Sequence, residues 1–184
     1  MTRLTALNRD QASSKSKELF DGIQAKLGTV PNMMRTMGNS SAVLEGYLNL
    51  SESLGKGALG AKMGEMIAMT VAEANACDYC LSAHAYIGTK LVGIEGEVLN
   101  ASRHAHHSDS KIEAGLHFAK TLVETQGKPS SEEVKAVLDA GYTEGEVGEI
   151  IAHVALNVFT NYFNNTANTE IDFPKVKANV NGVL

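Results

Sequence analysis

Apolar residues recur every three or four positions along most of the chain, a spacing that is typical of helices with one buried face. The pattern is interrupted at points rich in glycine, proline and serine, above all at the glycine-rich run 55–60. The expected helices cover approximately residues 14–27, 31–37, 41–54, 61–76, 77–91, 95–104, 111–125, 130–138 and 143–160. No stretch alternates polar and apolar residues as a half-buried strand does. The sequence therefore predicts an all-α fold in one domain spanning residues 1–184.

Capping signals refine several of these boundaries. A Ser or Thr followed three residues later by Glu forms a capping box, which marks the start of a helix. Three such pairs stand at the start of an expected helix: Ser110 with Glu113, Ser130 with Glu133 and Thr143 with Glu146. Beyond the last helix, the Asn-rich stretch 161–170 is expected to pass into irregular structure, and residues 171–174 to be extended before proline. A flexible tail is expected after about residue 175.

The composition and net charge of the chain argue against several classes of function. The 184 residues are 43% hydrophobic and 20% charged, as in ordinary soluble proteins, and the net charge is −5. That charge, without a basic stripe, argues against a nucleic-acid partner. The apolar runs are too short to span a bilayer, and the N-terminal residues lack the hydrophobic core of a signal peptide. We therefore expect a cytoplasmic protein with no nucleic-acid or membrane partner.

The residues best suited to catalysis lie in one stretch of the chain, residues 65–84. The only two cysteines, Cys77 and Cys80, form a C-x-x-C motif; His84 follows four residues after Cys80, and Glu65 lies twelve residues before Cys77. Two close cysteines in a protein that is not exported are more often catalytic or metal-binding than a structural cross-link. We therefore predict a redox site here.

Helical placement gives each of these residues a task. Cys80 would lie in the first turn of its helix, where free backbone amides favour a thiolate. His84 would share that helix face and exchange the thiol proton, and Glu65 would orient His84 or accept its proton. In a tight antiparallel hairpin, Glu65 falls roughly 7 Å short of His84 along the axis. We therefore expect a contact through water instead of a direct pair.

The two cysteines would divide the work of reducing a peroxide. A thiolate attacks the O–O bond and becomes a sulfenic acid, and the second thiol condenses with it to a disulfide. Spacing alone does not decide which cysteine attacks. The proximity of Cys80 to His84 favours Cys80 as the nucleophile and Cys77 as the resolving thiol.

The series Glu65, Cys77, Cys80 and His84 resembles the signature of AhpD-like alkylhydroperoxidases in the carboxymuconolactone decarboxylase superfamily. The segment 157–174 is similar to the C-terminal part of that family's peroxidase-related branch. The resemblance implies an all-α, AhpD-like helical bundle that forms homo-oligomers, as trimers, hexamers or dimers. It implies a peroxidase without cofactor or metal, in which Cys80 attacks, Cys77 resolves and Glu65 and His84 relay protons. A hydroperoxide would be the substrate, and a thiol protein, for example a lipoylated carrier, the reductant.

The chain departs from the family pattern at two positions. Tyr79 stands between the cysteines where classical AhpD has a histidine, and a phenol that stays protonated near neutral pH is no base. The peroxidase-related branch often has a histidine at the position of Asn165. Tyr79 motivates an alternative, a redox-sensing or small-molecule-binding module on the same fold without efficient turnover. A further alternative is a decarboxylase-like enzyme, in which the cysteine pair would have no role.

Other residues have plainer interpretations. The cysteines could form half of a zinc site completed by histidines, for which the candidates are His104, His106 and His107. The spacing between the cysteine pair and these histidines does not favour such a site. His153 is interpreted as a core residue of the last helix. Asn157 could line the pocket.

Overall fold

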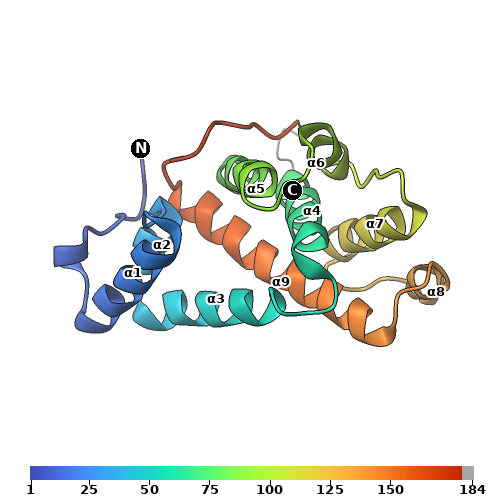
Figure 1. Cartoon of the computed structure of the whole chain (residues 1–184), viewed down its shortest axis with the longest axis horizontal. Helices are drawn as coiled ribbons and strands as arrows, with labels where there is room; N and C mark the ends of the chain where they lie inside the picture. Colours follow the sequence, from blue (N-terminus) through green and yellow to red (C-terminus); the bar gives the residue numbers. More distant parts are fainter. Residues whose placement is uncertain (180–184) are drawn as a thin grey trace.

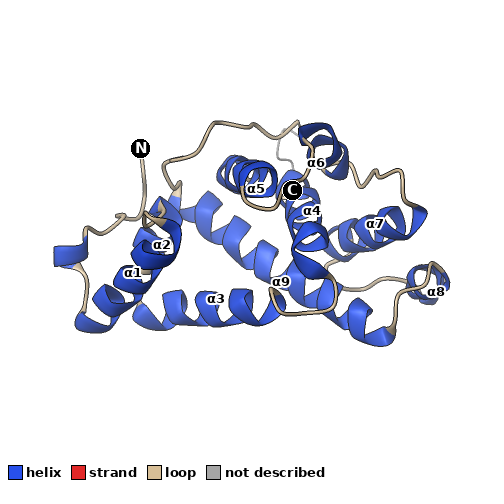
Figure 2. Cartoon of the chain, viewed as in Figure 1, coloured by secondary structure: helices blue, strands red, loops and turns tan. Residues whose placement is uncertain are grey.

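The computed structural model describes residues 1–179, and within this range the chain forms helices, turns and irregular segments with no strand. The elements are η1 (Arg9–Gln11), α1 (Ser14–Leu27), α2 (Asn32–Met37), α3 (Ser41–Leu54), α4 (Gly60–Ala74), α5 (Asp78–Lys90), α6 (Gly96–Ser102), α7 (Ser110–Glu124), α8 (Ser131–Asp139) and α9 (Glu144–Ala167). Figure 2 shows helices joined by short loops. The all-α prediction is confirmed.

Helix α4 is the centre of the packing. It contacts α5, α6, α7 and α9, and Figure 1 shows it crossing between α5 and the long α9, with α1, α2 and α3 forming an arm to one side. Its sequence is apolar around most of its circumference, which suits a helix that is enclosed on several sides. Ile67, Val71 and Ala72 are fully buried. Within the described chain, no helix has both the length and the apolar character needed to cross a membrane.

Two of the three expected capping boxes form as predicted, those that begin with Ser130 and with Thr143. The third prediction was wrong. Asp109, not Ser110, caps α7, because its carboxylate accepts hydrogen bonds from the backbone N–H groups of Lys111 and Ile112. An ionised carboxylate at a helix N-terminus also interacts favourably with the helix dipole.

Helix α9 is longer than the sequence predicts. It continues through the Asn-rich stretch to Ala167 and ends at Asn168, which has a left-handed conformation. Asparagine has a low helix propensity, but Asn161 and Asn164 are buried and hydrogen-bonded to other elements. Tertiary contacts therefore override the local preference in this segment.

The segment after α9 crosses back over α5 and α4 (Figure 1). The N–H of Val176 donates to Ser82 Oγ, that of Ala178 to Asp78 Oδ1, and that of Asn179 to Glu73 Oε1. Residues 176–179 are thus fixed, contrary to the flexible tail expected after about 175. The rest of that predicted tail, 180–184, lies outside the described residues.

A buried ion pair joins this segment to the centre of the fold. Arg103 donates from Nε to Glu73 Oε2 at 2.8 Å and from Nη2 to the Lys177 carbonyl at 2.7 Å. Both charged side chains are less than one-tenth exposed. A buried charge is tolerated only when it is paired and hydrogen-bonded, as here.

We expect Glu73→Gln to lower the free energy of unfolding by about 3–5 kcal/mol, because it leaves the Arg103 charge buried without its counter-ion. Urea unfolding followed by circular dichroism measures the change. Glu52→Gln, which breaks the exposed pair with Lys56, is the matched control and should leave the unfolding midpoint nearly unchanged. Equal effects of the two substitutions would contradict a stabilising role for the buried pair.

Candidate active site

The cysteine pair lies at the start of α5. Cys77 is the N-cap, and its Sγ accepts a hydrogen bond from the N–H of Cys80 at 3.3 Å. The turn from α4 is short because Ala76 adopts a left-handed conformation, with φ of 48°. Cys77 and Cys80 form a disulfide. A C-x-x-C motif opening a helix therefore places both sulfur atoms in the first turn, where backbone amides favour a thiolate.

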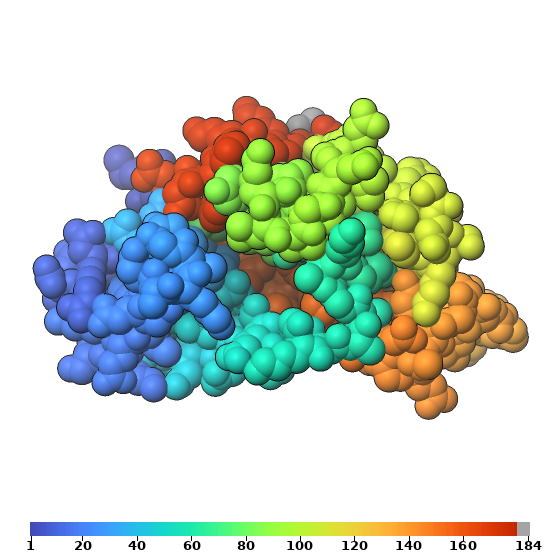
Figure 3. Space-filling model, in the orientation of Figure 1, coloured from blue at the N-terminus to red at the C-terminus, as the bar shows by residue number. Residues whose placement is uncertain are grey.

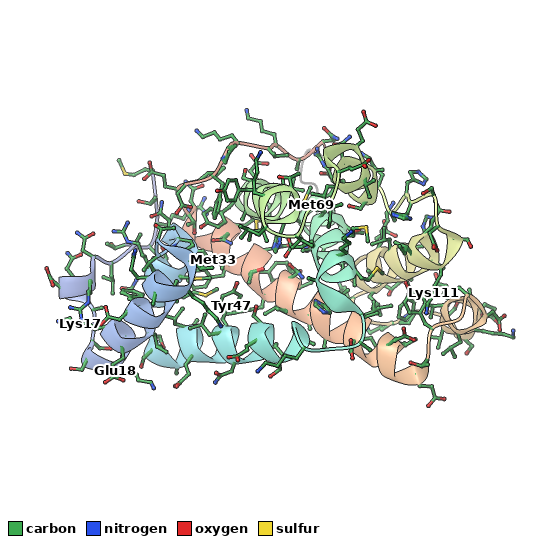
Figure 4. All side chains as sticks on the ribbon, in the orientation of Figure 1. Lys17, Glu18, Met33, Tyr47, Met69 and Lys111 are labelled. Atoms are coloured by element: carbon green, nitrogen blue, oxygen red, sulfur yellow. A yellow bond between two sulfur atoms is a disulfide. The ribbon has the colours of Figure 1, made fainter. Side chains whose placement is uncertain are left out.

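A cavity of about 530 Å³ opens beside Cys80. Its walls come from α2, α3, α4, α5 and α9, and the hollow in the middle of Figure 3 exposes atoms of α9 at its floor. Figure 4 shows Met33 and Tyr47 in the space between α2, α3 and α9. The apolar lining includes Leu27, Met33, Met34, Leu54, Ala68, Ile87, Leu91, Leu156 and Phe173. A cavity of this size and character suits a small organic molecule.

The two cysteines differ in access. Cys80 lines the cavity and is 3% exposed, whereas Cys77 is 0% exposed and is not among the lining residues. A molecule in the cavity therefore meets Cys80 first. Access, not spacing, distinguishes the two sulfur atoms.

Glu65 and His84 form a direct hydrogen bond, Oε2 to Nδ1, at 2.9 Å. Both side chains are partly buried and line the same cavity as Cys80. The expected water-mediated contact was wrong, because α4 and α5 cross steeply in Figure 1 instead of forming a parallel-sided hairpin. With Nδ1–H donated to the carboxylate, Nε2 is the basic nitrogen of a neutral His84.

Tyr79 has a structural role that its position in the motif did not reveal. Its hydroxyl oxygen accepts a hydrogen bond from the N–H of Met33 at 3.1 Å. The N-cap of α2 is Pro31, which offers no side-chain acceptor, so Tyr79 satisfies a donor at the start of α2 from a distant helix. Burial raises the pKa of Tyr79 well above its usual value, so the phenol stays protonated.

Sequence reasoning missed Asn164. Its Nδ2 lies 3.4 Å from Cys80 Sγ and 3.1 Å from Met33 Sδ, within hydrogen-bond range of both sulfur atoms. Its Oδ1 is buried and has no hydrogen-bond partner among the described residues. In the sequence, polar residues recur every three or four positions along the otherwise apolar helix α9, and this pattern could have indicated that one face of the helix lines a cavity. The residues of that series that line the cavity are His153, Asn157, Thr160 and Asn164.

His153 is buried, as predicted, but it also lines the cavity instead of packing only in the core. Burial lowers its pKa, partly offset by the negative charges of Glu149 and Glu65. Asn157 lines the cavity too, as the sequence allowed. On the wall formed by α3, burial and the nearby Glu65 carboxylate raise the pKa of Tyr47 to about 12. The imidazole of His153 and the phenol of Tyr47 are therefore both neutral near pH 7.

The geometry does not favour the zinc alternative. Cysteines in a disulfide are not thiolate ligands, and the histidines of the 104–107 loop do not line the cavity. His106 instead approaches two residues of α7, Glu113 and His117, and their ligand atoms lie within 4.8 Å of one another. These three side chains could hold a divalent cation, at the surface and apart from Cys80.

Comparisons with known proteins agree with this geometry. Residues 41–114, which carry the whole constellation from Glu65 to His84, match the carboxymuconolactone decarboxylase family model. This segment is similar to that family, and the helical fold of the whole chain is AhpD-like. No curated protein sequence matches it significantly.

Solved structures share the fold over nearly the whole chain. The alkylhydroperoxidase AhpD core protein of Ralstonia eutropha JMP134, named a peroxidase-related protein, superposes with a TM-score of 0.83 at 20% identity, covering 93% of this chain and 92% of that one. A peroxidase-related protein of Silicibacter sp. TM1040 gives 0.79 at 22%, covering 92% and 94%. The debrominase Bmp8 gives 0.78 at 24%, covering 94% and 93%, and a cysteine-to-alanine variant of it was solved with 2,3,4-tribromopyrrole.

We expect Tyr79→Phe to lower the free energy of unfolding by about 1–3 kcal/mol, because the Met33 N–H loses its buried acceptor. Thermal and urea unfolding measure the loss. The rate at which the reduced protein forms its disulfide should stay close to that of the unsubstituted protein. A large fall in that rate without loss of stability would instead assign Tyr79 to proton transfer.

Proposed function

We propose that the protein is a thiol-dependent peroxidase that reduces organic hydroperoxides through Cys80 and Cys77, with His84 and Glu65 as a proton relay. The observation that carries the proposal is a single cavity that presents Cys80, His84 and Glu65 together, with Cys77 bonded behind Cys80. This is an alkylhydroperoxidase-type activity. The AhpD-like fold supports it, although fold alone does not assign an activity.

In the first half-reaction, His84 accepts the thiol proton of Cys80 at Nε2, and the resulting imidazolium is stabilised by Glu65. The thiolate attacks the distal oxygen of the hydroperoxide and breaks the O–O bond. Cys80 becomes a sulfenic acid, and the leaving alkoxide takes the proton from His84 as an alcohol. The sulfur is oxidised and the peroxide reduced by the same two electrons.

In the second half-reaction, the thiolate of Cys77 attacks the sulfenic sulfur of Cys80 and forms the disulfide. The hydroxyl group leaves as water, taking up the proton that the Cys77 thiol released when it became a thiolate. Cys77 is well placed for this step, since the first turn of α5 stabilises its thiolate through the N–H of Cys80. The two sulfur atoms belong to the same short segment, three residues apart, and are bonded to each other in the structure.

Re-reduction needs an external dithiol. Its thiolate must attack Cys80, because Cys77 does not line the cavity. Cys77 is then the leaving group, and its N-cap position favours departure as a thiolate. A long, flexible dithiol that can enter the cavity, such as the lipoyl group of a carrier protein, fits this requirement. We propose such a protein as the reductant.

We further propose that the chain is a cytoplasmic homo-oligomer. Exposed apolar side chains on the long helix α9, Ile151, Phe159 and Tyr162, support self-association. Sedimentation velocity of the protein gives its mass in solution, and a monomer at micromolar concentration would contradict this part of the proposal.

We expect Cys80→Ser to abolish hydroperoxide consumption, because it removes the attacking sulfur, and Cys77→Ser to stop turnover with the sulfenic acid still on Cys80. Mass spectrometry after dimedone trapping locates the sulfenic acid. Continued turnover by Cys80→Ser would refute the role of Cys80.

Two further variants calibrate this experiment. Glu65→Gln keeps the shape of the side chain but not its charge, and we expect roughly a hundredfold slower disulfide formation. Glu113→Gln changes a carboxylate outside the cavity and is the matched control. Slow oxidation by hydroperoxides without turnover, even with several dithiols, would favour the redox-sensing alternative.

A second candidate function is reductive removal of bromine from an aromatic ring. The similarity to Bmp8 and the volume of the cavity favour it. The Cys80 thiolate would take bromine from the ring, whose carbon gains a proton, and Cys77 would then displace bromide and form the disulfide. One carbon–bromine bond is thereby exchanged for a carbon–hydrogen bond at the expense of two thiols.

Bromide release decides between the two candidates. We expect the reduced protein to convert organic hydroperoxides to alcohols rapidly and to release little bromide from tribromopyrrole. Ion chromatography of bromide and mass measurement of the disulfide follow both reactions in one sample. Stoichiometric bromide with slow hydroperoxide reduction would replace the peroxidase proposal by the second candidate.

A further inference from the structure

The floor of the cavity has a polar series that the proposed chemistry does not use. His153, Asn157, Thr160 and Asn164 follow one another at intervals of four, three and four residues on α9, and all four line the cavity. This spacing places them on one helix face. Only Asn164, at one end of the series, contacts the reactive sulfur.

The series is long compared with a peroxide group. His153 precedes Asn164 by eleven residues, which corresponds to about 16 Å along the helix axis. A molecule that reaches from Cys80 toward His153 therefore has an organic body in addition to its hydroperoxide. The apolar walls of the cavity match such a body.

The ring of His153 is free to bind a ligand, whereas its neighbours are engaged. Asn157 donates to the His153 carbonyl, and Thr160 donates to the Asn157 carbonyl. His153 is 9% exposed, and its Nε2 is buried with no hydrogen-bond partner within the described part of the chain. An unpartnered buried polar atom is unfavourable, and a ligand that supplied a partner would relieve it.

The opposite helix leaves room for this ring. Gly64 lies in α4, and a Cβ added there would be 3.0 Å from Cε1 of His153. Glycine within a helix is unfavourable compared with alanine, so the position costs stability. The close approach of the imidazole explains why a side chain is absent at this point.

The charges near His153 select the kind of ligand. Glu149 accepts hydrogen bonds from the N–H groups of Ala58 and Leu59, which lower its pKa and keep it ionised. Glu65 adds a second carboxylate on the α4 side. The two carboxylates that act on His153 therefore disfavour an anion beside its ring, and a neutral group that can hydrogen-bond with imidazole, such as a hydroxyl, fits there.

We propose that His153 is a substrate-binding residue that anchors the remote hydroxyl group of an otherwise apolar organic hydroperoxide, while the hydroperoxide end reaches Cys80. The inference rests on the proposed function for the reaction but not for the binding. It assigns the substrate class as neutral, elongated and hydroxyl-bearing. Hydrogen peroxide, which has no organic body, would be a weaker substrate. So would fatty-acid hydroperoxides, whose carboxylate would come near the negative charges of Glu149 and Glu65 that act on His153.

A pair of matched product analogues tests the binding directly. One is a tertiary alcohol on a biphenyl, the reduction product of the corresponding hydroperoxide, and the other carries an added hydroxymethyl group on the far ring. Isothermal titration of the disulfide form should show about tenfold tighter binding of the second alcohol. His153→Leu should remove this preference without weakening the first alcohol, and His153→Gln, which can still donate and accept, should restore part of it.

The controls separate a binding role from a structural one. His104→Leu, on an exposed histidine outside the cavity, should keep the full preference. Should His153→Leu fail to fold, Gly64→Ala displaces the same ring, and it should reduce the preference in the same way. In turnover, His153→Leu should raise KM for the hydroxyl-bearing hydroperoxide about tenfold and leave kcat unchanged.

Two results would overturn the inference: no preference in the unsubstituted protein, or an undiminished preference in both His153→Leu and Gly64→Ala. Because the titration uses alcohols and the oxidised protein, it does not depend on peroxidase activity. A hydroxyl preference without hydroperoxide turnover would therefore refute the proposed function while supporting the binding site. Hydroperoxide turnover without a preference for the hydroxyl-bearing alcohol would support the proposed function and refute the binding site at His153.

Discussion

The crossing of α4 and α5 brings together residues that a simple hairpin would keep apart. The two helices are joined by only Asn75, Ala76 and Cys77, and the left-handed Ala76 turns the chain sharply. The crossing sets Glu65 against His84 at 2.9 Å, with Cys80 on the same cavity wall. Helix α4 is enclosed by α5, α6, α7 and α9, and close packing in protein interiors resists displacement. The Glu65–His84 pair is therefore held by the core of the molecule rather than by a loop.

Segments far apart in the sequence close the cavity around this crossing. Tyr79 of α5 and Asp172 of the C-terminal segment both accept hydrogen bonds from the first N–H groups of α2, and α2 in turn contributes Met33 to the cavity wall. Phe173 packs edge-on against Tyr79. The residue that departs most clearly from the classical motif thus has a structural task, and it is not part of the Glu65–His84 pair.

The cavity combines an apolar wall with a polar floor, and the groups in and near it differ in charge. Burial keeps Tyr47 and His153 neutral near pH 7, whereas Glu149 is held as a carboxylate by two backbone N–H groups. Hydrogen bonds are stronger in such surroundings than in water, and an unpaired group costs more. The unpartnered polar atoms of His153 and Asn164 therefore belong to residues that line the same cavity as Cys80.

The sequence by itself determined the all-α fold and most helix boundaries, and it singled out the four residues of the candidate site, because helical periodicity, capping and C-x-x-C spacing are local properties of the chain. It also placed Cys77 and Cys80 correctly at the start of a helix. Only the tertiary structure decided the direct pair of Glu65 and His84, since the crossing of two helices is set by packing and not by rise along one axis. The same holds for Asn164 and the open ring of His153, whose neighbours come from α2, α4 and α5. A helix face becomes a binding surface only when other elements leave a space beside it.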